Sequence, residues 1–222
     1  MLLLNLLTAL LAVILPNPSP SASPGERELP TIVTVISSPY CNSLADHFNG
    51  AMVPMLANDR VLEGTSVQLD TLNTLFHQTN YAQQYMHVQD QIERQETILN
   101  ESLAGISRNI VMLRDGAALT TDAQAKAQIT KASWELQTAY DHQRQLAIDL
   151  MNLYLAMRNY NVNYANPPMG GFSEREMTES AAMRDSKSWL HFDSQRAVIA
   201  QSEDQAVDTA YLAAQTYCVP KK

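Results

Sequence analysis

The chain has 222 residues and a formal net charge of −8, with 45% hydrophobic and 17% charged residues. This length and composition allow one substantial domain with its own core and exclude general disorder. No basic stripe is present to neutralise phosphates, so the charge argues against binding to nucleic acid or to an acidic membrane surface. With 7% aromatic residues and seven glycines, the composition favours helices over a β-sandwich.

The N-terminal residues 1–15 form an uncharged apolar run that is typical of a signal-peptide core and is too short to cross a bilayer comfortably. The following PNPSPSASP supplies small residues for cleavage. We therefore predict a signal peptide at residues 1–22 and a Pro/Ser-rich leader at residues 23–38, and hence a periplasmic or extracellular protein. Because no Lys or Arg precedes the apolar run, a retained anchor and a buried structural segment are the alternatives.

The chain has two cysteines, Cys41 and Cys218, near the two ends of the predicted mature chain. An even count in an exported protein favours a disulfide. If the bond lies within one chain, loop closure stabilises the fold by about 5 kcal/mol before strain is subtracted. A bond between chains and two free thiols are the alternatives, and the absence of a Cys-x-x-Cys pair argues against a redox role.

The first predicted helix begins near Pro39, because proline suits the first position of a helix. Its apolar residues follow at helical spacing, at Leu44, Phe48, Ala51, Met52 and Met55. Pro54 lies inside this stretch and predicts a kink or an end. Residues 58–64 predict the next break, so this N-terminal helix is expected to be short.

Residues 65–114 predict a long helix that contains no proline and only one glycine, Gly105. Its apolar residues recur every seven positions, at Tyr85, Ile92, Leu99, Ile106 and Leu113. Asp115 and Gly116 are typical of a C-terminal helix end, and the candidate N-caps of the next helix are Thr120, Thr121 and Asp122.

The clearest pattern lies in residues 122–164, which predict a helix about 65 Å long. Steps of three and four residues connect Ile129, Ala132, Leu136, Ala139, Gln143, Leu146, Leu150, Leu153, Met157, Tyr160 and Tyr164. Gln143 is the one member that is neither apolar nor aromatic. This spacing is typical of a coiled-coil seam, and we expect it to be buried.

Residues 166–171, NPPMGG, end this helix, and residues 172–217 predict a third long helix whose first part is polar. The predicted fold is all-α: an elongated antiparallel bundle of three long helices with coiled-coil-like packing plus a shorter N-terminal helix. It forms a single domain at residues 39–218, followed by a tail at residues 219–222. A perfectly regular bundle of this kind cannot bring Cys41 to Cys218, so we expect interruptions near Pro54 and at residues 173–188, with the larger one at residues 173–188.

No motif in the sequence specifies a reaction. The five histidines lack the spacing of zinc or di-iron sites, and phosphate-binding loops, nucleophile elbows and Cys/His pairs are missing from the sequence. We therefore predict no catalytic residue, no metal site, no cofactor and no enzymatic activity.

One segment combines tyrosine, asparagine and apolar residues, a mixture that binding surfaces use. Its candidate binding residues are Tyr160, Asn163, Tyr164, Met169 and Phe172. The alternative is a helix end whose tyrosines pack on neighbouring helices. The predicted function is that of an exported, non-catalytic scaffold or protein-interaction protein, for example an accessory of an envelope or secretion assembly. A helical-bundle receptor for a small apolar or aromatic ligand is the second hypothesis, and self-association through coiled-coil packing is a further alternative for the partner.

Overall fold

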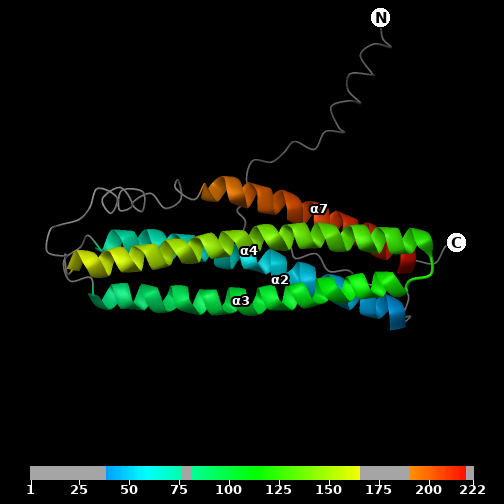
Figure 1. The fold of residues 1–222 in the computed structure, drawn as a ribbon, viewed down its shortest axis with the longest axis horizontal. Coiled ribbons are helices and arrows are strands. Elements are labelled where there is room, and N and C mark those ends of the chain that lie inside the picture. The colour runs from blue at the N-terminus through cyan, green and yellow to red at the C-terminus, as the bar shows by residue number, and fades with distance from the viewer. Residues whose placement is uncertain (1–38, 77–81, 166–190, 219–222) are drawn as a thin grey trace, which may run out of the picture.

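The computed structural model describes residues 39–76, 82–165 and 191–218. These residues form four α-helices, α2 (Pro39–Phe76), α3 (Ala82–Leu119), α4 (Ala123–Ala165) and α7 (Phe192–Cys218), and contain no strand. The all-α fold class is therefore confirmed. The helices lie side by side along one long axis, and each runs antiparallel to the helix before it in the chain (Figure 1).

The helices pack in two close pairs, α2 with α3 and α4 with α7, while α3 and α4 pack less closely. Helix α2 also contacts α4 and α7, so a continuous core runs between the four helices. Phe48, Met52 and Ile106 belong to its largest fully buried side chains. The looser contact between α3 and α4 matters for function, because it leaves space between these two helices.

The described residues form four helices, which is compatible with the prediction, but the predicted boundaries at the N-terminal side are wrong. Helix α2 has 38 residues and continues through Pro54 and residues 58–64, where a break was expected. Residues 65–76 belong to α2, so the predicted helix at residues 65–114 does not exist as one unit. The shortest of the four described helices is α7, with 27 residues, and not the N-terminal helix.

Helix α2 continues through Pro54 because a neighbouring helix replaces the missing hydrogen bond. Proline has no backbone N–H, so the carbonyl of Gly50, four residues earlier, loses its helical donor. The Nδ2 of Asn109 on α3 donates to this carbonyl at 3.1 Å and to the carbonyl of Gly105 at 3.0 Å. A Cβ at position 50 would lie 2.7 Å from the same Nδ2, so glycine is what allows the contact. Nδ1 of His47 hydrogen-bonds the Oδ1 of Asn109 at 3.1 Å.

This arrangement gives the first testable prediction. Asn109→Ala is expected to lower the free energy of unfolding by about 1–3 kcal/mol, because it leaves the carbonyl of Gly50 without a donor. In a Pro54→Ala background the helix supplies its own N–H, so Asn109→Ala should cost clearly less. Chemical denaturation of the four proteins of this double-mutant cycle measures the difference. Equal costs in both backgrounds would contradict the proposed role of Asn109.

Gly64 does not end α2 either, because it serves a contact with α3. A Cβ at this position would lie 2.9 Å from the Nε2 of Gln95. The hydroxyl of the adjacent Thr65 donates to the Oε1 of Gln95 at 2.9 Å and to the carbonyl of Val61 at 2.8 Å. At residues 58–64, α2 therefore continues without a break and approaches α3 closely.

The turn between α3 and α4 lies slightly beyond its predicted place. Helix α3 continues past Gly116 to Leu119. Of the three candidate N-caps, Asp122 takes this role: its Oδ1 accepts from the backbone N–H groups of Gln124 at 2.9 Å and Ala125 at 3.1 Å. The hydroxyl of Thr120 hydrogen-bonds the hydroxyl of Tyr40 at 2.7 Å, which connects this turn to the start of α2.

The predicted seam of α4 is buried from Ile129 to Met157. The side chains of Tyr160 and Tyr164 lie outside the described part of the structure. At the other end of the chain, α7 begins at Phe192, twenty residues after the predicted start at Phe172, and residues 166–190 are not described. The predicted interruption at residues 173–188 falls in this range.

The start of α2 and the end of α7 lie at the same end of the helical core (Figure 1). Cys41 is buried in the first turn of α2 and is not a free thiol. Helix α7 ends at Cys218, whose side chain is outside the described residues. The topology therefore brings the two cysteine positions to one end without the expected break at Pro54.

Candidate functional site

The predicted binding segment lies at the C-terminal end of α4 and beyond it. Tyr160, Asn163 and Tyr164 belong to the last turns of α4, but their side chains are not described. Met169 and Phe172 fall in the range 166–190, outside the described residues. The candidate site in the described part of the chain lies nearer the middle of α4.

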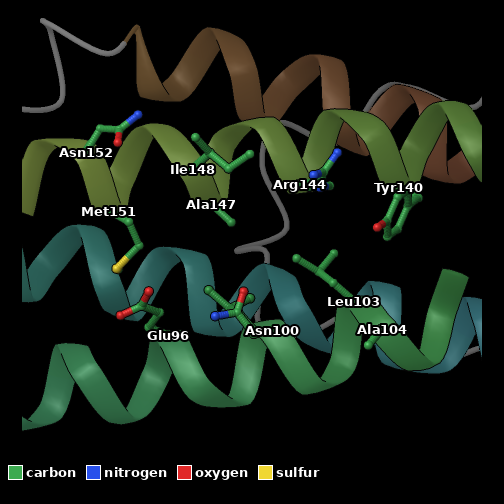
Figure 2. Close-up of a pocket in the computed structure, with 11 residues that line it drawn as sticks. Glu96, Asn100, Leu103, Ala104, Tyr140, Arg144, Ala147, Ile148, Met151 and Asn152 are labelled. Atoms are coloured by element: carbon green, nitrogen blue, oxygen red, sulfur yellow. The ribbon is translucent and has the colours of Figure 1, made fainter.

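A groove of about 440 Å³ opens between the middle parts of α3 and α4 (Figure 2). We call it the α3–α4 groove. It is lined by Glu96, Leu99, Asn100, Leu103, Ala104, Tyr140, Arg144, Ala147, Ile148, Met151 and Asn152. Leu99, Leu103 and Ala147 are buried and form its apolar floor. In Figure 2, Leu103 from α3 and Met151 from α4 point toward the space between the two helices.

Two opposite charges line this apolar floor. Glu96 on α3 is half-buried and Arg144 on α4 is exposed. Within the described part of the chain, neither side chain has a hydrogen-bond or ion-pair partner. Along α3, Glu96 precedes Leu103 by seven residues, or about 10 Å of helix. Because Figure 2 shows Arg144 across the groove from Leu103, the two charges stand about two helical turns apart along the groove.

Side-chain contacts between α3 and α4 lie beyond one end of the groove. The hydroxyl of Tyr154 donates to the Oε1 of Glu93 at 2.8 Å, and Nη1 of Arg158 lies 3.9 Å from the same oxygen. Burial raises the pKa of Tyr154 well above its usual range, and the hydrogen bond to Glu93 adds to this shift. The phenol therefore stays protonated at neutral pH and acts as a hydrogen-bond donor between the helices.

At the other end, an arginine and a tryptophan form a contact on the surface. The guanidinium carbon of Arg114 lies 4.9 Å from the centroid of the Trp134 ring, within range of a cation–π interaction. Its Nη2 donates to the Oε1 of Gln137 at 3.1 Å. Arg and Trp are enriched among residues that dominate binding at protein interfaces.

Large apolar side chains remain exposed along α4 beside the groove. Trp134, Ile148 and Leu155 are 61%, 40% and 49% exposed, and their separations of 14 and 7 residues are multiples of a heptad. We call these three residues the outer stripe of α4. On α3, exposed Ala104, Val111 and Ala118 repeat every seven residues as well. Ile148 and Ala104 line the groove, and the other members of the two rows lie beyond its ends along α4 and α3.

Sequence reasoning missed the groove and the outer stripe. The stripe follows the same seven-residue interval as the buried seam of α4, with the exposed Asp141 as a polar interruption between Trp134 and Ile148. What the sequence did not reveal is that α3 packs less closely against α4 than against α2. Without the looser packing of α3 against α4, the outer stripe cannot be distinguished from part of one wide buried face.

The polar exception in the seam, Gln143, lies in a buried cluster away from the groove. Its Nε2 donates to the carbonyl of Met55 at 2.6 Å and to a carboxylate oxygen of Glu203 on α7, and its Oε1 accepts from Asn58 on α2 at 3.3 Å. All three polar side chains are buried. Because solvent does not reach this buried polar cluster, its role is to align α2, α4 and α7 relative to one another.

Searches for other kinds of site add two observations. Among residues 39–76, 82–165 and 191–218, no group of three or more His, Cys, Asp or Glu side chains could hold a metal ion. In the same ranges, no helix combines the length and the hydropathy that a membrane span requires.

Comparison with protein-family models, with curated proteins and with solved structures finds no match. The fold and the groove thus define an all-α protein with an open apolar groove between two antiparallel helices.

Proposed function

We propose that this protein is an exported, non-catalytic interaction or scaffold protein that binds a protein partner in the α3–α4 groove. The exported state rests on the sequence of residues 1–24, and an accessory role in an envelope or secretion assembly fits that compartment. Both the groove and its exposed margins lie on described residues, whereas the Tyr/Asn segment at the end of α4 stays a second candidate surface.

The observation that carries the proposal is the outer stripe of α4 beside an apolar floor. Single exposed apolar residues are ordinary on protein surfaces, but several of them along one groove mark an interaction site. A partner that covers Trp134, Ile148 and Leu155 removes their apolar area from water, which stabilises the complex by about 25 cal/mol for each Å² buried. Trp134 and Arg114 add the residue types that are most enriched in such contacts.

The titratable side chains of the groove stand apart from one another. Enzymatic nucleophiles and bases stand within hydrogen-bond distance of each other. Glu96, Tyr140 and Arg144, the titratable side chains that line the groove, make no such pair with one another in the described structure. The groove offers shape, apolar area and two separate charges, which serve binding.

One feature favours the second hypothesis, a receptor for a small apolar or aromatic ligand. The groove volume of about 440 Å³ falls within the range of roughly 300–1,000 Å³ that small-molecule sites occupy. Tyr140 and Met151 line it, and both side chains suit an aromatic ligand. Native mass spectrometry of the purified protein would detect such a ligand as a discrete added mass.

A photo-crosslinking experiment tests the proposed function. A photoreactive amino acid at position 148, in the groove, is expected to give one discrete crosslinked product in the native cell envelope. The same amino acid at position 98 provides the matched control, because Ile98 is 52% exposed but does not line the groove. Equal products at both positions, or none at position 148, would contradict the proposal.

Substitution gives the corresponding affinity prediction. Ile148→Glu places a charge against the apolar floor and is expected to weaken partner binding by about tenfold or more, whereas Ile98→Glu should leave it unchanged. Binding of the crosslinked and identified partner to each purified variant measures the effect. Circular dichroism confirms that both variants remain helical.

A further inference from the structure

We infer that the α3–α4 groove binds an amphipathic α-helix of the partner, with one basic and one acidic residue about seven positions apart. This inference rests on the proposed function and specifies the partner's chemistry. It follows from the length of the exposed rows, from the shape of the groove and from the two opposite charges that line it.

The length of the outer stripe indicates a helix. Trp134 and Leu155 are 21 residues apart, which corresponds to about 32 Å along α4. A small ligand in the central hollow would leave both of these residues in water. A helix of about six turns laid along the groove covers them together with Ile148, and helices that pack lengthwise meet their neighbours at intervals of seven residues.

The shape of the groove fits the side chains of such a helix. The floor of Leu99, Leu103 and Ala147 is buried and apolar, so it accepts aliphatic side chains from above. On the α3 side, the lining includes the short residue Ala104, which allows another helix to approach closely. This geometry corresponds to the recognition of an amphipathic helix in a groove between two helices.

The charges define the polar residues of the partner. A helix in the groove partly removes Glu96 and Arg144 from water, which costs free energy unless each receives an opposite charge. Because the two stand about 10 Å apart along the groove, the matching positions on a helix are about seven residues apart. The partner therefore carries a basic residue near Glu96 and an acidic residue near Arg144.

Three synthetic peptides test this pattern. Each has about 25 residues, with leucines at the a and d positions of a heptad repeat, and the three differ only at two positions seven residues apart. The mixed peptide has Lys and Glu there, the basic peptide has two Lys and the acidic peptide has two Glu. Fluorescence anisotropy with the full chain is expected to show that the mixed peptide binds about tenfold more tightly than the others, since each of those places one like charge against the groove.

Charge reversal in the protein should change the preferred peptide. With Arg144→Glu both groove charges are negative, and the basic peptide is expected to bind best. With Glu96→Lys both are positive, and the acidic peptide is expected to bind best. Ile98→Glu, away from the groove, should leave the order unchanged. An order that does not follow these substitutions would overturn the inference.

The experiment separates this inference from the proposed function. If crosslinking at position 148 captures a partner but none of the three peptides binds, the proposed function stands and the helical partner is wrong. If crosslinking at position 148 fails, the proposed function itself is wrong. A dimer in sedimentation experiments that dissociates on Ile148→Glu would identify a second copy of the chain as the occupant and would also overturn the inference.

Discussion

Leu150→Ala is expected to lower the free energy of unfolding by about 2–5 kcal/mol. Leu150 is 1% exposed and belongs to the continuous core between the helices. Its truncation removes buried methyl groups and leaves a cavity that rigid neighbouring helices do not fill completely. The loss is a large part of the total stability of an ordinary domain.

Leu155→Ala provides the matched control on the same helix. Leu155 is half-exposed, so the same chemical change removes little buried area and creates no closed cavity. Urea denaturation of both variants should therefore show a clear shift of the midpoint for Leu150→Ala and only a small one for Leu155→Ala. Similar shifts for the two variants would mean that α4 is rotated relative to the described seam.

The seam that contains Leu150 is the part of the fold that the sequence predicted best. The seam of α4 followed from the sequence because its three-four spacing extends over many turns, and every described member of that seam is buried. Helix boundaries depended on tertiary contacts instead. Pro54 predicts a break locally, but Asn109 on α3, which lies 55 residues later in the chain, supplies the missing hydrogen bond.

The candidate site was harder to predict than the core. A row of apolar residues in a sequence is the same whether it is buried or exposed, and Ile148 was not distinguishable from Leu146 or Leu150 by type. The difference arises from the distance between α3 and α4, which depends on all four helices together. The charges Glu96 and Arg144 come from different helices, so the sequence alone gave no reason to consider them as a pair.

The length of α2 also decides where the two cysteine positions lie. A first helix that ended near Gly64 would have been too short to reach the end of a long final helix. Because α2 continues to Phe76 and the chain passes up and down through four helices, the first helix starts where the last one ends (Figure 1). The length of α2, and not a break at Pro54, therefore brings the two cysteine positions to the same end of the helical core.

The last prediction concerns the bond between these cysteines. We propose that Cys41 and Cys218 form an intrachain disulfide, supported by the burial of Cys41, by the lack of a free thiol there and by the end of α7 at the same pole. Replacing both residues by serine is expected to lower the free energy of unfolding by up to about 5 kcal/mol, because the bond closes a loop that spans nearly the whole fold.

Two measurements check this bond. Intact mass spectrometry after alkylation without reduction should show no labelled cysteine in the wild-type chain, and a nonreducing gel should show a monomer. Urea denaturation in the presence and absence of reductant should then reproduce the loss seen in the double serine variant, while reductant should not affect that variant. A dimer on the nonreducing gel would instead place the bond between two chains, and two labelled thiols would mean that it does not form.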